Sequence, residues 1–332
     1  MEVTVLDSLT KNSQEIDVIK KMVCKAFNNL EISLKADSVN ELTEGCYNSA
    51  YNIILENDLE VILKVSPKPK SKVLFYEGNI MNTEVTALKL VKNNTTVPVP
   101  KIYFYDTSKA ICSSDYFFME KIPGCTLLSL QDTLLDDEKN KILFELGVFH
   151  KEINSLTGTY YGYPGRKELQ GKTWPEAFMK MFNSLLSDGK TNNVNIGISY
   201  EGIYEIVKNN LYCLNDITKP HLVHWDLWDG NIFIEDSKIS GIIDFERALW
   251  GDPLMEYYFN EIPDNKVPKS FLDGYGICHF TANEVRKRIL YNIYLYLIMT
   301  IECSYRKYPD DTQYEYGKVM LKQQLNLLGE LY

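Results

Sequence analysis

The sequence predicts an α+β fold in two parts, with strands in the first part and helices in the second. Short apolar segments of strand-like composition recur between residues 38 and 120, whereas apolar residues at helical spacing dominate from residue 136 onward. A Pro/Gly-containing segment, Lys121 to Gly124, lies between these regions. We therefore expect a small β-rich part over residues 1–122 and a larger, mainly helical part over residues 123–332.

Composition places the chain among cytoplasmic globular proteins. A hydrophobic fraction of 45% is ordinary, and the net charge of −10 argues against nucleic acid as a partner. The longest apolar run, residues 289–301, is shorter than the roughly 20 residues of a membrane helix, and the first 30 residues lack the apolar stretch of a signal peptide. Seven cysteines without a C-x-x-C pair indicate neither a disulfide framework nor a zinc site. The oligomeric state stays open.

The first part is predicted to contain two helices and several strands. One helix covers residues 14–27, with Ser13 as its candidate N-cap, and another covers residues 75–91. The strands are expected at residues 38–42, 50–55, 60–65, 101–105 and 115–120.

The second part is predicted to be helical around one hairpin-containing segment. Helices are expected at residues 136–154, 174–186, 200–214, 282–305 and 312–331, and the aromatic stretch 256–278 is expected to be rich in loops. His150 and His221 are interpreted as structural residues, because a histidine among apolar neighbours usually serves packing or capping.

The segment 221–245 carries the strongest chemical signal. It contains His224-Trp225-Asp226-Leu227 followed by Asn231, the spacing H-x-D-L-x-x-x-N. The apolar runs 231–234 and 239–243 flank a polar turn and predict a β-hairpin, so that Asn231 and Asp244 at its ends can face one point. An amide oxygen and a carboxylate there suit Mg²⁺, and Asp226 is placed to accept a proton. Asp and Asn also stabilise turns on their own account, but that alternative does not explain the whole spacing.

Together with Gly251-Asp252-Pro253, this segment resembles the aminoglycoside phosphotransferase family, a branch of the protein-kinase-like fold. The resemblance implies a two-lobe fold: residues 1–122 as a nucleotide-binding lobe and residues 123–332 as a lobe with the catalytic loop and the acceptor site. It further implies that Asp226 deprotonates the acceptor hydroxyl, and that Asn231 and Asp244 hold Mg²⁺ on ATP or GTP. His224 is expected to support the loop, and Asp252 to stabilise it from the following turn.

The resemblance also assigns nucleotide-binding residues to the first part. Lys64, in the strand 60–65, is expected to hold the α- and β-phosphates, with Glu84 of the helix 75–91 as its partner and Glu77 as the competing partner. A lysine in such a strand is otherwise a solvent-facing residue of the alternation.

Two further nucleotide contacts are expected on backbone groups. The turn 43–49, which ends at Ser49, would cover the phosphates, although an ordinary hairpin turn with one glycine explains it more simply. Backbone groups from Glu120 to Ile122 would hold the edge of the base.

Two departures from the family pattern and two further features bear on the class of kinase. Trp225 stands where the phosphotransferases usually have glycine, which suggests that its ring shapes the acceptor pocket, and Glu246 stands where protein kinases have the glycine of D-F-G. Trp228 replaces the lysine of serine/threonine kinases, and Gly251-Asp252-Pro253 follows Asp244 too closely for an activation loop. A protein kinase is thus disfavoured, and a non-catalytic pseudokinase is disfavoured because Lys64, Asp226, Asn231 and Asp244 are all present.

Charge points to a cationic small-molecule acceptor. Residues 1–122 carry 14 Lys+Arg against 16 Asp+Glu, a net −2, and residues 123–332 carry 21 against 29, a net −8. An acidic site would attract a polycation such as an aminoglycoside, although an acidic surface also serves solubility. The run from Asp226 to Asn231, D-L-W-x-G-N, resembles the fructosamine kinases, which makes a glycated amine the second candidate acceptor.

Overall fold

A computed structural model describes residues 10–28, 30–32, 37–43, 45, 47–260, 266–306 and 308–330. The chain forms two compact units. The first consists of Met1–Val73, Pro100–Ile122 and Tyr305–Pro309, and the second of Leu74–Val99, Pro123–Ser304 and Asp310–Tyr332. The division expected from the sequence shares the boundary after Ile122, whereas the packing places Leu74–Val99 in the second unit.

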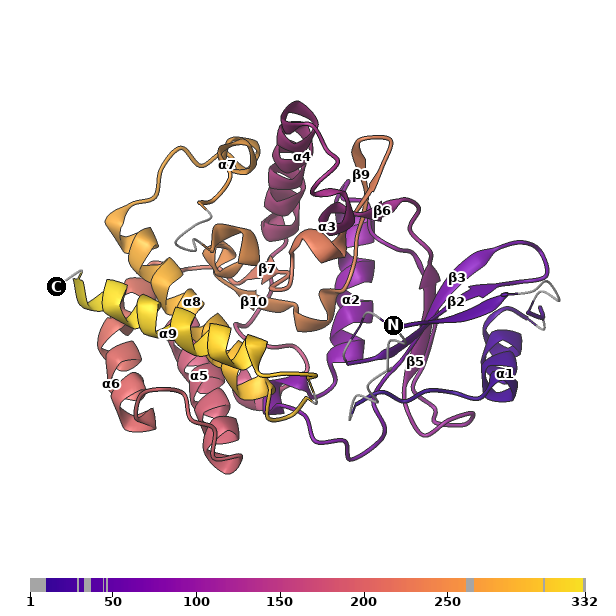
Figure 1. Ribbon diagram of the computed structural model, residues 1–332, viewed down its shortest axis with the longest axis horizontal. Helices are drawn as coiled ribbons and strands as arrows, with labels where there is room; N and C mark the ends of the chain where they lie inside the picture. The colour runs from indigo at the N-terminus through magenta and orange to yellow at the C-terminus, as the bar shows by residue number, and fades with distance from the viewer. Residues whose placement is uncertain are drawn as a thin grey trace. The chain divides into compact units, whose positions relative to one another are not determined.

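The first unit is built on a five-stranded antiparallel sheet that packs against a helix (Figure 1). In spatial order the strands are β1 (Val39–Leu42), β2 (Ser49–Ile54), β3 (Glu60–Val65), β5 (Tyr116–Glu120) and β4 (Ile102–Asp106). Alternate residues of β2 are buried, as expected for a strand with one face on a core. Helix α1 (Ile16–Ala26) covers that core with Ile19, Met22 and Val23. All five predicted strands are confirmed, each bound shifting by one residue at most.

The start of α1 differs from its prediction. Its N-cap residue is Glu15, whose side chain makes no capping hydrogen bond. The predicted cap, Ser13, instead donates its hydroxyl to Glu41 at 3.0 Å. The first-turn N–H groups therefore lack the side-chain acceptor that a serine cap would supply.

The helix predicted over residues 75–91 is interrupted. A 3₁₀ turn, η1 (Phe75–Glu77), is followed by Gly78 and Asn79, and α2 (Ile80–Asn94) begins only then. Asn79 has a left-handed backbone with φ of 64°, which no helical residue adopts, and asparagine tolerates this conformation better than most residues. Glu84 stays within the helix, whereas Glu77 falls outside it.

The second unit is mainly helical, as predicted. Its longer helices are α4 (Asp136–Ser155), α5 (Trp174–Thr191), α6 (Tyr200–Asn210), α8 (Ala282–Glu302) and α9 (Thr312–Glu330). Helices α8 and α9 lie side by side, and α8 is buried over most of its length (Figure 1). None of the helices that the structure describes has the length and apolar content to cross a bilayer.

One helix of this unit, α7 (Lys269–Tyr275), lies in the stretch that was predicted to be loop. It packs on α4 where glycines let the two backbones approach. A Cβ atom on Gly147 would lie 2.2 Å from the carbonyl oxygen of Phe271, and one on Gly274 would lie 2.0 Å from that of Phe144. The seven-residue helix is thus fixed by tertiary packing, which periodicity in so short a segment does not reveal.

Two small antiparallel sheets carry the predicted catalytic segment. Strand β7 (His221–Val223) pairs with β10 (Leu249–Gly251), and β8 (Ile232–Glu235) lies between β6 (Cys125–Thr126) and β9 (Lys238–Ile242). The predicted hairpin is therefore confirmed, with Asp236 and Ser237 at positive φ in its two-residue turn. The remaining short elements are α3 (Leu127–Leu130), η2 (Lys167–Leu169), η3 (Leu211–Leu214), η4 (Asp229–Asn231), η5 (Phe245–Arg247), η6 (Pro253–Met255) and η7 (Tyr257–Phe259).

Candidate active site

The loop that follows β7 bends sharply at Trp225. This residue has φ of 70°, a left-handed conformation that costs a non-glycine residue about 1–2 kcal/mol. The indole is buried and stacks on Tyr294 of α8 with ring centroids 5.9 Å apart. Packing therefore holds the strained backbone, and the bend directs the next residue, Asp226, away from the strand. Because its ring is only 2% exposed, Trp225 supports the loop from below, contrary to the expectation that it shapes an open pocket.

The imidazole of His224 joins this loop to the end of the hairpin. The N–H of Asp226 donates to Nδ1 at 3.2 Å, and Nε2 lies 2.8 Å from the carbonyl oxygen of Ile243. Since Nδ1 accepts, the proton belongs on Nε2, and the ring is neutral. Burial lowers the pKa of His224, which agrees with that neutral form. One side chain thus fixes the separation between Asp226 and the residue before Asp244, the supporting role predicted for it.

A second support lies under the loop at Glu256. Its Oε2 accepts the N–H of His224 at 2.8 Å, and its Oε1 accepts the N–H of Tyr257 at 3.2 Å. The buried His150 places Nε2 at 3.4 Å from the same carboxylate and packs its ring on Phe259 and other aromatic residues. Burial alone would raise the pKa of Glu256, but His150, His224 and the N–H of Trp225 together lower that pKa. His150 is structural, as expected.

The predicted acid–amide pair is brought together by the same segment. The Asn231 amide nitrogen donates to the carbonyl oxygen of Asp226 at 2.8 Å and to its carboxylate at 3.4 Å. The N–H of Ile243 donates to the backbone carbonyl oxygen of Asn231 at 3.0 Å, which places Asp244 next to Asn231 across the hairpin. With its nitrogen engaged by Asp226, Asn231 keeps its amide oxygen for a cation.

The carboxyl group of Asp226 lies in a strongly electrostatic setting. The residue is half-buried, and its pKa is raised to about 7. Removal from water is the main cause. The positive charge of Arg247 opposes the rise, and the negative charges of Asp244 and Glu302 add to it. Arg247 itself donates to Glu302 of α8 at 3.1 Å. A carboxyl with a pKa near neutrality is suited to accept a proton from a hydroxyl.

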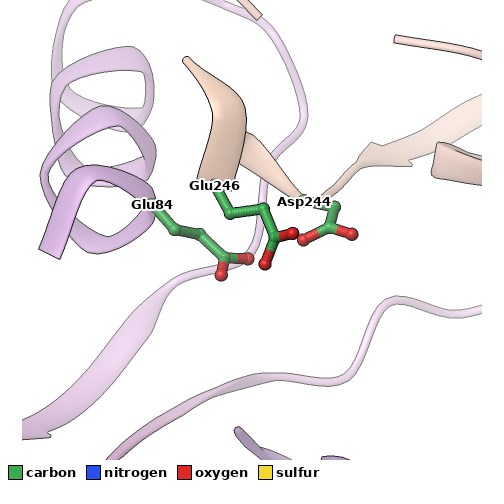
Figure 2. Close-up of side chains that lie close together, drawn as sticks. All are labelled: Glu84, Asp244 and Glu246. Carbon is green, nitrogen blue, oxygen red and sulfur yellow. The ribbon is translucent and has the colours of Figure 1, made fainter. Parts of the chain in front are cut away.

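Three carboxylates meet beside the hairpin end. Glu84 of α2, Asp244 and Glu246 each place an oxygen within 4.8 Å of the others, and Figure 2 shows the three side chains converging. Asp244 has φ of 68°, so the backbone turns left-handed at the residue that carries the predicted metal ligand. Such a hard-oxygen set fits Mg²⁺. Sequence reasoning noted Glu246 only as a departure, because no spacing rule brings α2 onto η5.

Asp252 anchors the segment that follows. Its Oδ1 accepts the N–H of Leu254 at 3.1 Å, and its Oδ2 accepts the hydroxyl of Tyr291 at 2.7 Å and pairs with Lys287 at 3.2 Å. The residue is 2% exposed and follows β10, the partner strand of β7. Its contacts are those of a stabilising residue of the fold.

The predicted nucleotide-binding residues of the first unit have these surroundings. Lys64 is 8% exposed on β3, opposite Ala50 in the strand register. The Ser49 hydroxyl accepts the N–H of Asn12 at 2.8 Å. Ile122 is nearly buried, and Glu120 accepts the N–H of Lys101 with its side chain at 3.0 Å.

Two further predictions concern the turn 43–49 and the side chain of Glu77. Of the turn 43–49, residues 44 and 46 lie outside the described part of the chain. The competing partner Glu77 accepts the N–H of Leu74 at 2.8 Å, a local cap.

A model of the phosphotransferase enzyme family matches residues 38–259, about two thirds of the sequence. The chain belongs to this family. The match includes β1 at one end and the Asp252 anchor near the other, so the predicted catalytic segment lies within it.

Solved structures with this fold cover almost the whole chain. A candidate fructosamine-3-kinase from Haemophilus somnus 129PT is 17% identical, with a TM-score of 0.67 over 92% of this chain and 96% of its own. An aminoglycoside phosphotransferase, APH(4)-Ia, solved with AMP-PNP and hygromycin B, is 15% identical, with a TM-score of 0.66 over 93% and 97%. At these identities the likeness shows the fold, which is the two-lobe protein-kinase-like fold predicted.

The curated relatives match a smaller part of this chain than the solved structures do. A candidate ketoamine kinase from Vibrio parahaemolyticus is 24% identical over 228 residues, 64% of this chain and 70% of the relative. A subtelomeric hrmA-associated cluster protein from Aspergillus fumigatus is 26% identical over 123 residues, 37% of this chain. The match spans only 23% of that relative's length.

We expect His224 to contribute a loss of stability as the pH drops below 6.5, the ordinary pKa of histidine. Because burial lowers the pKa of His224, the unfolded chain takes up a proton there that the folded chain does not, and stability present above pH 6.5 is lost toward the lower, folded pKa. In His224→Gln this contribution is gone. Between about pH 7.5 and about pH 5.5 the melting temperature of the wild type should therefore fall relative to that of His224→Gln, because the raised pKa of Asp226 acts alike in both proteins. Parallel pH dependences of the two proteins would contradict the neutral, bridging histidine.

Proposed function

We propose that this chain is a small-molecule O-phosphotransferase, which transfers the γ-phosphoryl group of ATP or GTP to a hydroxyl of its acceptor. The observation that carries the proposal is the His224-bridged arrangement of Asp226, Asn231 and Asp244. It supplies a proton acceptor and two oxygen ligands at one place, within a chain that belongs to the phosphotransferase enzyme family. Phosphoryl transfer needs mainly such positioning and charge neutralisation.

The proposed reaction uses the residues in distinct roles. Asp226 accepts the proton of the acceptor hydroxyl while the hydroxyl oxygen bonds to the γ-phosphorus, and the bond from that phosphorus to the bridging oxygen breaks to release the nucleoside diphosphate. Asn231 and Asp244 would hold Mg²⁺, whose charge stabilises the phosphate oxygens when it is bound. Glu246 supplies a further oxygen beside Asp244. Lys64 would hold the α- and β-phosphates, and the backbone from Glu120 to Ile122 the base.

The proposed acceptor is an amino-bearing polyhydroxy compound. The net −8 of residues 123–332 favours a cation. Aminoglycosides and glycated amines both fit, and the solved neighbours and the Vibrio relative are described as kinases of these two kinds. The aromatic Trp228 after Asp226 and the short connection to Asp252 argue against a protein substrate.

Asp226→Asn should keep the fold and nucleotide binding but lower turnover by ~10²-fold or more, the usual effect of losing a general base. The measurement is nucleoside diphosphate release in a coupled assay with a panel of aminoglycosides and fructosamines, alongside a thermal melt. Turnover close to that of the wild type would remove Asp226 from the chemistry. Release without any acceptor dependence would contradict the proposed function itself.

Asp244→Ala should abolish turnover at every Mg²⁺ concentration while the protein stays folded, because a half-buried metal ligand is lost. Asp252→Ala is the matched control, also a carboxylate in the segment after the hairpin. Its loss leaves Lys287 buried without one of its partners, which typically costs about 3–5 kcal/mol of stability. An inactive Asp252→Ala with an unchanged melting temperature would show that the two roles have been interchanged.

A further inference from the structure

Exposed aromatic side chains gather around the catalytic loop. Tyr257 is 43% exposed, Tyr316 41% and Trp228 37%. Rings of this size are usually more buried, and in a protein that binds small molecules, exposed rings near the reacting group commonly form its binding surface. Each of the three comes from a different element: the loop, η7 and α9.

Hydrogen bonds tie Tyr257 to the loop that carries Asp226. The Glu256 carboxylate accepts the N–H of His224 on one oxygen and the N–H of Tyr257 on the other, at 2.8 and 3.2 Å. The neighbouring Tyr258 donates its hydroxyl to Asp229, three residues after Asp226. Tyr257 therefore holds its position relative to the loop through the backbone on one side and through the next side chain on the other.

Trp228 and Tyr316 are held against fixed neighbours. The Trp228 ring lies over Gly230, where a Cβ atom would come within 2.5 Å of it. Tyr316 of α9 packs edge-to-face on Tyr296 of α8, with ring centroids 6.2 Å apart. The Tyr257 ring lies 6.3 Å from that of Tyr258, centroid to centroid, and burial raises the pKa of Tyr257, with Tyr316, Asp229 and Asp226 raising it further.

The faces of these rings differ from those of several other tyrosines. Within the part of the chain that the structure describes, cationic side chains lie over Tyr212 (Arg286, 5.6 Å) and Tyr314 (Lys318, 4.7 Å), and none lies over Tyr257 or Tyr316. The Asp229 carboxylate, in contrast, accepts the hydroxyl of Tyr258, whose ring packs on that of Tyr257. A cation from outside the chain would meet both an aromatic face and negative charge here.

We propose that Tyr257 and Tyr316, with the carboxylate of Asp229, form an acceptor subsite that binds an ammonium group beside Asp226. This rests on the proposed function, since it names what the acceptor presents to the loop. The rings attract the cation through their negative faces, and the carboxylate supplies the opposite charge. An ammonium seated there leaves a hydroxyl of the same molecule to face Asp226.

Binding can be tested apart from turnover. Isothermal titration of the full chain with kanamycin and with fructosyl-lysine gives affinities for aminated acceptors, and titration with sorbitol gives that for a neutral polyol. The variants are Tyr257→Ala and Tyr316→Ala, with Tyr257→Phe to keep the ring without its hydroxyl. Tyr212→Ala is the matched control, an exposed tyrosine on η3 that is 55% exposed. Thermal melts establish that each variant is folded.

The wild type should bind at least one aminated probe more tightly than sorbitol. Each alanine variant should weaken that binding roughly fivefold, the scale of one partly exposed cation–π contact, while Tyr257→Phe and Tyr212→Ala should leave it nearly unchanged. Equal affinity for aminated and neutral probes, or unchanged binding by Tyr257→Ala and Tyr316→Ala, would overturn the subsite. Failure of the proposed function looks different: the aminated probes bind, yet no phosphorylated product forms with any of them.

Discussion

The imidazole of His224 is the contact on which the candidate site depends. It accepts from the backbone of Asp226 and donates to the backbone of Ile243, so it connects the loop after β7 to the end of β9. Without it, Asn231, which donates to Asp226 and accepts from Ile243, would be left to tie the two segments together. A neutral, buried ring with one donor and one acceptor suits this bridge, and Glu256 and His150 support it from beneath.

The setting of the site concentrates negative charge. Asp226, Asp244, Glu246 and Glu84 lie on or beside the predicted catalytic segment, and Arg247 shares its charge between Asp226 and Glu302. Carboxylates this close repel one another unless a cation or protons are shared among them. The family to which the chain belongs gives that arrangement a purpose, since a nucleotide–metal complex and a cationic acceptor would both be attracted to it.

Much of this could be predicted from the sequence because the signals are local. The alternation in β2, the apolar run of β3, the hairpin before Asp244 and the spacing of Asp226 and Asn231 each depend on residues close together in the chain. What escaped prediction depends on distant contacts or on unusual backbone. A left-handed Asn79 separates the 3₁₀ turn η1 from α2. Glycines 147 and 274 let α7 form against α4. Glu84 meets Glu246 only because α2 packs on η5. The left-handed backbone of Trp225 also escaped prediction. Its conformational cost is offset by packing of the indole on Tyr294, a residue distant in the sequence.

The position of the metal tests the central claim most directly. In crystals grown with Mn²⁺ and a non-hydrolysable ATP analogue, an anomalous difference map locates the ion without reference to any mechanism. Our account predicts an ion that is bound by the side-chain oxygens of Asn231 and Asp244 and contacts the phosphates of the nucleotide, with Asp226 beside the γ-phosphate. An ion bound to phosphates but to neither Asn231 nor Asp244, or a γ-phosphate remote from Asp226, would contradict it.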